Sequence, residues 1–258
     1  MKIRIKFSKQ GNMKFIGHLD IMRYFQKAMR RADVNIRYSE GFSPHQIMSF
    51  AAPLGVGLTG SGEYLDIDVL SSDASKEMVR RLNDTMVEGM EVLSFRKLPD
   101  DAANAMSLVA AADYTVRLRD GWGEKLSVDG KKFFSALSEF LETGDLNIVK
   151  KTKKGQRTMD LKPLIYEHRL LEDGNAIFLK LSSGSTDNVK PELVLEAFLK
   201  SLKPEEEYPS IAFLINREEL YAKMDGNGKA AVQGAESEKD GGGTCRYVSL
   251  EEFGEDIE

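Results

Sequence analysis

Two histidines near the start of the chain are the residues best suited to acid–base chemistry. His18 opens a basic segment, and His45 lies in the turn Gly41-Phe42-Ser43-Pro44-His45. Imidazoles titrate near neutral pH, so a pair can act as general base and acid in metal-independent RNA cleavage, with Tyr38 or Ser43 assisting. The alternative, which we prefer, is that His18 caps a helix and His45 bonds its own turn. We therefore assign no catalytic residue.

Cysteine content and hydropathy exclude several other classes of protein. Cys245 is the single cysteine in 258 residues, so the chain alone holds no disulfide, thiolate zinc site or iron–sulfur cluster. We assign no metal site. The N-terminal segment MKIRIKFSKQ lacks the apolar core of a signal peptide, and no apolar run reaches about 18 residues. These features predict a cytoplasmic protein with no membrane partner.

Charge is distributed unevenly although the net charge is only −5. Residues 1–50 carry ten Lys/Arg against three Asp/Glu, whereas residues 225–258 carry nine acids against three bases. Three basic groups form a plausible track for phosphates. They are Lys2, Arg4 and Lys6 on a strand, Arg23, Lys27, Arg30 and Arg31 on a helix, and Lys150, Lys151, Lys153, Lys154 and Arg157 on a hairpin. An acidic protein surface is the main competing partner.

Apolar periodicity predicts the elements that carry these cations. In residues 2–7, KIRIKF, Ile3, Ile5 and Phe7 alternate with the three cations, which is typical of a strand with one buried face. From His18 to Ala32, Leu19, Met22, Phe25, Met29 and Ala32 form a helical apolar stripe, which leaves the basic residues outside. Strands near residues 46–51, 64–70 and 90–98 and a helix near 76–86 complete the order strand-helix-strand-strand-helix-strand.

The same order starts again after a small-residue linker near residues 100–112. A strand near residues 114–119, helices near 133–141 and 190–202, a hairpin turn at Asp173-Gly174 and a last strand near 211–221 repeat it. We therefore predict an α+β protein with two tandem ferredoxin-like domains, residues 1–99 and 113–222, the second with an extra hairpin. Residues 223–258 are polar, acidic and rich in glycine, which predicts a flexible, disordered tail.

The segment Tyr38–Gly57 is the most unusual loop. It combines glycines and prolines with a histidine and aromatics, and it is too apolar to be disordered. Gly55–Gly60 has the spacing of a dinucleotide fingerprint but runs into a strand, so we prefer a strand connection. We expect the loop to form the rim of a pocket, with Phe15, Tyr38 and Phe42 available to stack on bases. The predicted pocket residues are Asp20, Tyr38, Gly41, Phe42, Ser43, Pro44 and His45.

Three stretches are similar to a known bacterial family. KFIGHLDIMRYFQKAMRRADVNIRYSEGFSPHQIMSFAAPLGVG, KKTKKGQRTMDLKP and NVKPELVLEAF occur in that order and resemble the radical-SAM-linked domain of unknown function, over about residues 1–220. This domain occurs alone or behind a radical S-adenosylmethionine enzyme with a cobalamin-binding domain. The resemblance implies no cofactor in this chain, with the iron–sulfur cluster, S-adenosylmethionine and cobalamin in the partner. The genes of the family often lie near those for ribosomal proteins and an RNA-processing ribonuclease, which points towards RNA.

Three functional hypotheses follow. The first is an accessory module, without chemistry of its own, that binds tRNA or rRNA for a separate radical S-adenosylmethionine protein. The second is a metal-independent endoribonuclease that uses His18 and His45. The third is an adaptor that docks only proteins.

Overall fold

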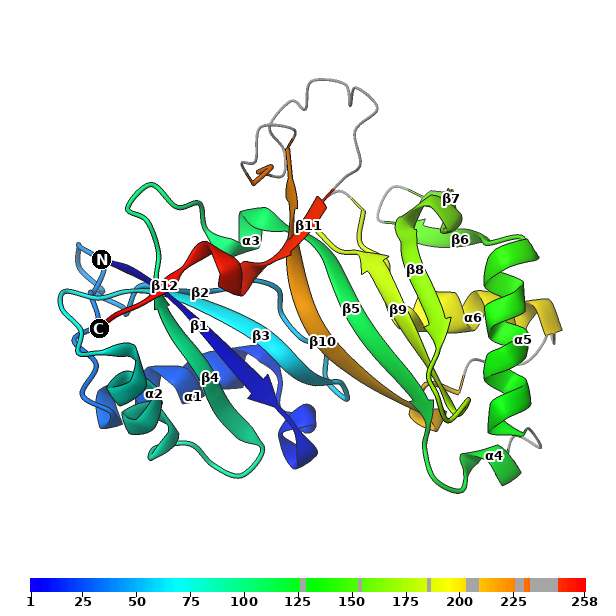
Figure 1. The fold of residues 1–258 in the computed structure, drawn as a ribbon, viewed down its shortest axis with the longest axis horizontal. Helices are drawn as coiled ribbons and strands as arrows, with labels where there is room; N and C mark the ends of the chain where they lie inside the picture. The colour runs from blue at the N-terminus through cyan, green and yellow to red at the C-terminus, as the bar shows by residue number, and fades with distance from the viewer. Residues whose placement is uncertain (126–128, 153–154, 185–186, 203–208, 226–229, 233–245) are drawn as a thin grey trace. The chain divides into compact units, whose positions relative to one another are not determined.

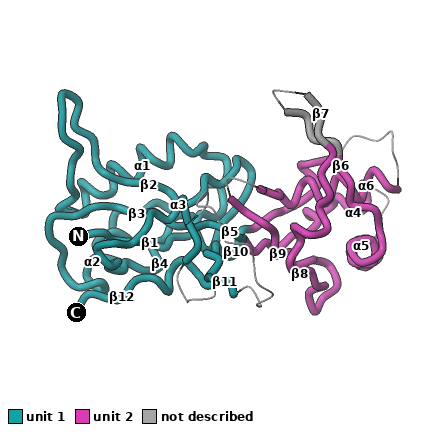
Figure 2. The backbone as a smooth tube through the Cα atoms, turned by 90° about the horizontal axis from the view of Figure 1, so that it is seen from above, with its two compact units in different colours: residues 1–111, 217–258 teal, residues 112–216 magenta. Residues whose placement is uncertain are grey.

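The computed structural model describes residues 1–125, 129–152, 155–184, 187–202, 209–225, 230–232 and 246–258. The chain divides into two compact units, residues 1–111 with 217–258 and residues 112–216 (Figure 2). Helices and antiparallel strands occur in both units, which confirms the α+β class. Within the described ranges, no helix combines the length and the apolar character needed to cross a bilayer.

Unit 1 contains the first strand-helix-strand-strand-helix-strand series. Its elements are β1 (Lys2–Lys9), the 3-10 helix η1 (Gly11–Phe15), α1 (His18–Arg31), β2 (Met48–Phe50), β3 (Thr59–Asp68), α2 (Ser75–Asn83), β4 (Met90–Lys97) and α3 (Ala105–Leu108). The strands pair antiparallel in the order β4-β1-β3-β2. Figure 1 shows α1 and α2 on one side of β1, β3 and β4.

The core of unit 1 follows the predicted alternation in β1. Ile3, Ile5 and Phe7 are buried among side chains of both helices, such as Phe25 of α1 and Met78 of α2. The rings of Phe7 and Phe25 meet edge to face at 4.8 Å between centroids, a favourable geometry for aromatic pairs. The inward face of β1 is therefore as predicted.

The C-terminal segment is not a flexible tail over residues 246–258, which corrects our expectation. It forms β11 (Arg246–Ser249), the 3-10 helix η4 (Leu250–Phe253) and β12 (Glu255–Asp256). Strand β11 pairs with β10 (Phe213–Met224), and β12 pairs with β4. Figure 1 shows this red segment crossing the side of the sheet opposite α1 and α2. We call residues 246–258 the C-terminal strap; it is held because Leu250 is fully buried and Val248 nearly so.

Gly60, the last glycine of the Gly55–Gly60 segment, lies within a strand, as does Gly62. Strand β3 begins at Thr59, five residues before the predicted start, and includes Gly60 and Gly62. A Cβ on Gly62 would collide with the backbone oxygen of Glu218, so this position needs glycine for close approach of two chains. No helix follows Gly55–Gly60, and the geometry of a dinucleotide site does not form there.

A second group of elements, within residues 109–224, makes up unit 2, although its first strand begins and its last strand ends within unit 1. Its elements are β5 (Val109–Leu118), α4 (Trp122–Lys125), α5 (Gly130–Thr143), β6 (Asn147–Thr152), β7 (Gly155–Asp160), η2 (Lys162–Leu164), β8 (Ile165–Leu170), β9 (Ala176–Ser182), α6 (Pro191–Leu202) and η3 (Ser210–Ala212), followed by β10. The strand order is β10-β5-β9-β8, and β6 and β7 pair only with each other. Phe133 of α5 packs on Phe198 of α6 at 5.3 Å between ring centroids.

Candidate functional site

Helix α1 presents a row of cations to solvent because its apolar stripe faces the sheet. The buried side chains are Ile21, Phe25, Ala28 and Met29. Residues four and three positions apart share one face of a helix, so Arg23, Lys27 and Arg30 line up on the opposite side, with Arg31 beside them. We call these four residues the basic helix face. Arg30 and Arg31 lie in the last turn, where cations are also favoured by the helix dipole.

The charges of the basic helix face are mostly uncompensated within the described part of the chain. Arg23 pairs with Asp20 at 3.1 Å, but both side chains are about two-thirds exposed, so the pair contributes little. Arg30 donates from Nε to the Gln26 carbonyl. Lys27 and Arg31 are exposed and make no ion pair with a described residue. An exposed group of like charges of this kind gives the surface a positive potential.

A tight loop over residues 38–46 follows α1; we call it the aromatic loop. An isolated bridge joins Tyr38 to Gln46, and the Ser39 N–H donates to the His45 carbonyl at 2.8 Å. The Ser39 hydroxyl also lies 2.9 Å from His45 Nδ1 and accepts from the His45 N–H at 3.1 Å. His45 thus forms hydrogen bonds within its own turn, which is the structural role that we preferred over a catalytic one. At the tip, Phe42 is completely exposed.

The basic helix face and the aromatic loop meet at the C-terminal end of α1. Arg30 and Tyr38 line a single hollow of about 440 Å³, together with Asp33, Val34, Asn35 and Ile36. Arg37, at the root of the loop, is exposed and is anchored by its N–H to the Asp68 carbonyl at 2.7 Å. Positive charge and aromatic surface from two neighbouring elements therefore converge here. Arg30 and Tyr38 are the predicted site residues that line this hollow.

The two histidines do not come together, contrary to the arrangement that a nuclease would require. The His18 ring packs edge to face on Phe50 at 5.2 Å between centroids. Phe50 lies five positions after His45 in mainly extended chain, which corresponds to about 16 Å. Asp20 belongs to the first turn of α1 with His18, so the predicted pocket of Asp20 with the loop does not form either. Ser43 and Pro44 are exposed in the aromatic loop.

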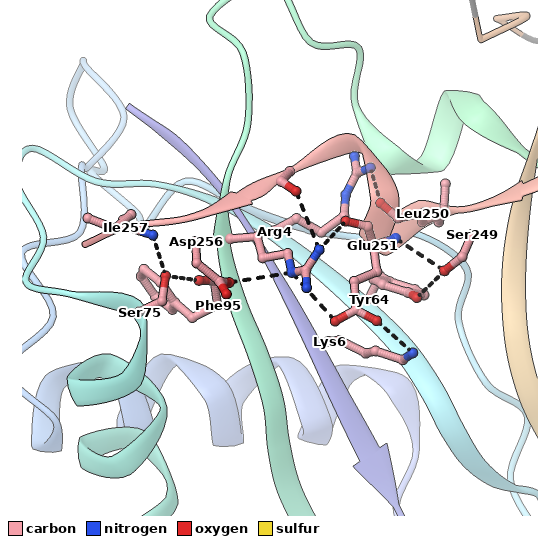
Figure 3. Close-up of polar contacts among 12 residues, drawn as sticks. Arg4, Lys6, Tyr64, Ser75, Phe95, Ser249, Leu250, Glu251, Asp256 and Ile257 are labelled. Carbon is pink, nitrogen blue, oxygen red and sulfur yellow. Dashed lines mark hydrogen bonds and ion pairs between the residues drawn. The ribbon is translucent and has the colours of Figure 1, made fainter.

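The strand cations do not form an open basic face either. Arg4 is 1% exposed; its Nε pairs with Asp66 at 2.8 Å and its Nη1 donates to the Leu250 carbonyl at 3.0 Å. Lys6 pairs with Glu219 at 2.8 Å and with Glu251 at 2.9 Å. Figure 3 shows the strap over these residues.

Lys2 is likewise engaged, since it donates to the Ala102 carbonyl at 2.6 Å. The prediction that Lys2, Arg4 and Lys6 contact a polyanion is therefore wrong for this structure. Positive charges on a strand face that becomes covered must be paired with negative charges or hydrogen-bond acceptors. Here Asp66, Glu219 and Glu251 of the same chain supply most of the negative charge.

The electrostatics of the strap follow from these pairs. Burial lowers the pKa of Lys6, but Glu219 and Glu251 outweigh it, so the net pKa is raised. Burial raises the pKa of Glu251, but the hydrogen bonds from Lys6 and Ser94 and the nearby positive charges together lower it by more. The net effect is a lowered pKa. The charged forms of both partners are thus favoured. The Tyr64 hydroxyl donates to Glu219 at 2.6 Å and lies 3.0 Å from the Ser249 hydroxyl, which joins the strap to β3 and β10.

The hairpin cations lie in unit 2. Lys151 pairs in register with Gln156, and Lys150 with Arg157, across β6 and β7. Lys153 and Lys154 fall outside the described residues, and the side chains of residues 149–157 are also outside them. Their predicted contacts with RNA stay a prediction.

Sequence reasoning missed an exposed apolar patch near the start of α1. Leu19 was predicted to face the core but is 66% exposed, and Ile21 is buried in its place. Phe15, Ile16 and Val56 are also exposed. The Gly57 N–H donates to the Lys14 carbonyl at 2.8 Å, which brings the loop that carries Val56 beside η1. We call Phe15, Ile16, Leu19 and Val56 the apolar patch; surfaces of this kind often contact partners.

A buried ionic cluster lies behind the same region. Arg217 pairs with Glu63 through two hydrogen bonds and also donates to the Ala52 carbonyl at 2.7 Å. Lys9 is buried, donates to the Ile16 carbonyl at 2.9 Å, and has a pKa lowered by that burial. No local pattern in the sequence signals this cluster, because Arg217 and Glu63 are 154 residues apart.

Comparison with known proteins identifies a family but no activity. The model of a family described as an uncharacterized protein conserved in bacteria, DUF2344, matches residues 2–191. No curated protein matches the chain. The expected link with radical S-adenosylmethionine enzymes stays a prediction.

Proposed function

The chain belongs to the DUF2344 family of uncharacterized bacterial proteins, and we propose that it is an accessory module that binds RNA through the basic helix face. The main observation behind this proposal is that Arg30 of that face and Tyr38 of the aromatic loop line the same hollow. Cations attract the phosphates and exposed rings can stack on bases, which together are the usual means of binding single-stranded nucleic acid. The predicted RNA is tRNA or rRNA.

The strand orders support a finer assignment of the fold. Orders β4-β1-β3-β2 and β10-β5-β9-β8 place equivalent elements in the same sequence twice. We infer two tandem ferredoxin-like domains, the second carrying β6 and β7 as the extra hairpin. Such sheets bury one face under helices and leave the other for further contacts. In unit 1, the C-terminal strap occupies that second face.

The apolar patch supports a protein partner as well. Exposed leucine, valine, isoleucine and phenylalanine side chains beside one another have no role in phosphate binding, but they suit a protein contact. We propose that a radical S-adenosylmethionine protein with its own iron–sulfur cluster and cobalamin docks there. The chain itself would contribute no cofactor. An adaptor without RNA binding is the second candidate function that this patch favours.

Catalysis by the histidine pair has less support. His18 and His45 lie on separate elements, each with its own structural contact. Residues that share a proton must lie within hydrogen-bond reach of one substrate. We therefore propose binding rather than cleavage.

The test is a binding assay with charge-reversed proteins. Arg23, Lys27, Arg30 and Arg31 are replaced by Glu, and a second protein carries Gln at the same positions to limit damage to the helix dipole. The control reverses four exposed lysines of unit 2, Lys125, Lys131, Lys132 and Lys200. We expect binding of a labelled, unstructured RNA to weaken at least about 100-fold in the first protein. Equal weakening in the control, or no binding by the native protein, would refute the proposed function.

A further inference from the structure

We propose that the aromatic loop binds the base of an unpaired nucleotide, so that the RNA recognised by this protein is single-stranded or looped rather than duplex. This inference rests on the proposed RNA binding by the basic helix face. It adds a site, built around Phe42 and Tyr38, and a class of substrate. The argument has three parts: the presentation of Phe42, the chemistry of the hollow, and the geometry of duplex RNA.

Phe42 is presented to solvent by a loop with fixed ends. The side chain is fully exposed, and Gly41 before it has φ +107°, a conformation that favours glycine. The bonds between Ser39 and His45 close the base of the loop on both the backbone and the side-chain side. Because the base of the loop is already closed, the backbone of the loop loses less conformational entropy on binding than an open loop would. Phe42 does not serve the core of unit 1.

The hollow beside the loop suits a neutral ring better than a second phosphate. Arg30 supplies a positive group, Asp33 a negative one and Tyr38 an aromatic ring, while Val34 and Ile36 also line the hollow but are largely buried. A phosphate would be repelled by the carboxylate of Asp33. A nucleobase is uncharged, stacks on aromatic rings and has donors that a carboxylate accepts.

The surrounding cations can hold the phosphates on either side of such a base. Lys27 and Arg31 continue the basic helix face away from the hollow, and Arg37 lies at the root of the loop, directly before Tyr38. Bases within an A-form duplex are stacked on one another and expose only their edges. Phe42 therefore has a ring face to contact only where the RNA is unpaired.

The experiment uses the full chain and one fluorescein-labelled 12-nucleotide RNA without self-complementarity, either alone or annealed to its complement. The native protein is compared with Phe42→Ala and Phe42→Leu. Tyr166→Ala is the matched control, since Tyr166 is an exposed aromatic residue of β8, in unit 2, and belongs to neither the aromatic loop, the basic helix face nor the apolar patch. Far-UV circular dichroism confirms that each variant is folded.

We expect the native protein to prefer the single strand. Phe42→Ala should weaken single-strand binding between about 5-fold and 150-fold, the range for loss of one base stack. Phe42→Leu should lose nearly as much, because leucine is apolar but has no ring. Duplex binding and the salt dependence should stay unchanged, since no charge is altered, and Tyr166→Ala should bind like the native protein.

Three results would overturn the inference. Native-like single-strand binding by Phe42→Ala would show that the loop makes no base contact, and RNA binding by the basic helix face would still stand if its charge-reversed protein failed to bind. Native-like binding by Phe42→Leu would show that Phe42 makes an apolar contact with the RNA and does not stack on a base. An equal loss in Tyr166→Ala would show that the effect is not specific to the aromatic loop. Absence of RNA binding by the native protein would instead refute the proposed function itself.

Discussion

Replacement of Leu250 by alanine tests whether the C-terminal strap is an integral part of unit 1. The Leu250 side chain is 0% exposed, and its carbonyl accepts a hydrogen bond from Arg4. The substitution removes the side chain but keeps the carbonyl, so it isolates the apolar contribution. Leucine-to-alanine changes at buried sites cost about 2 to 5 kcal/mol. We take about 3 kcal/mol, because the strap lies on one face of a sheet and its surroundings can partly close the cavity.

The assay is urea unfolding followed by far-UV circular dichroism. With a slope of about 2 kcal/mol per molar urea, a loss of about 3 kcal/mol lowers the midpoint by about 1.5 M. Leu70→Ala is the control, since Leu70 belongs to unit 1 and is 61% exposed; its free energy of unfolding should change by less than about 0.5 kcal/mol. Equal, small changes in both variants would refute the packing of the strap.

Further predictions concern the buried charges and the histidines. Glu63→Gln should lower the free energy of unfolding by about 3 kcal/mol or more at pH 7, because it leaves the buried charge of Arg217 uncompensated. Part of this loss should be regained as the pH rises towards 10.5. Burial lowers the pKa of Lys9, so in this range the folded state releases the Lys9 proton while the unfolded state keeps it. Lys9→Met in the same background should remove this pH dependence, and its persistence would contradict the assignment. Burial and Glu219 raise the pKa of Tyr64, so folding stability should fall above about pH 10, where the unfolded phenol ionises, and Tyr64→Phe should reduce that fall. His18→Ala and His45→Ala should leave a labelled RNA intact in chelator, as the native protein does; cleavage that either substitution abolishes would restore the nuclease hypothesis.

Local periodicity predicted which side chains of each element face the core. Ile3, Ile5 and Phe7 are buried as expected, because alternation along a strand is a property of the backbone itself. The helix stripe was right for Phe25 and Met29 but wrong for Leu19, because at 100° per residue Leu19 lies on the side of α1 away from the buried Ile21, Phe25 and Ala28. A period fixes the spacing of the buried residues, but where two adjacent apolar residues compete it does not show which of them faces the core.

What covers the other face of the sheet could not be read from local pattern. The strap meets Arg4 across 246 residues of sequence, and its acidic composition is the same feature that suggested a disordered tail. The alternation of Tyr247, Val248, Ser249 and Leu250 was the available signal for an ordered segment. One acid of the strap, Glu251, pairs with Lys6 of β1, whereas Arg4 finds its carboxylate in Asp66 of β3, so the partners of the β1 cations come from segments that are distant in the sequence.

The salt dependence of RNA binding tests the central claim most directly. Each phosphate contacted on a single strand contributes about 0.7 to the slope of log K against log salt concentration. Four cations of the basic helix face with Arg37 predict a slope of about −3.5 for the native chain, and the protein with Arg23, Lys27, Arg30 and Arg31 changed to Gln should retain a slope no steeper than about −0.7. A native slope near zero, or a slope unchanged by the four substitutions, would contradict the account.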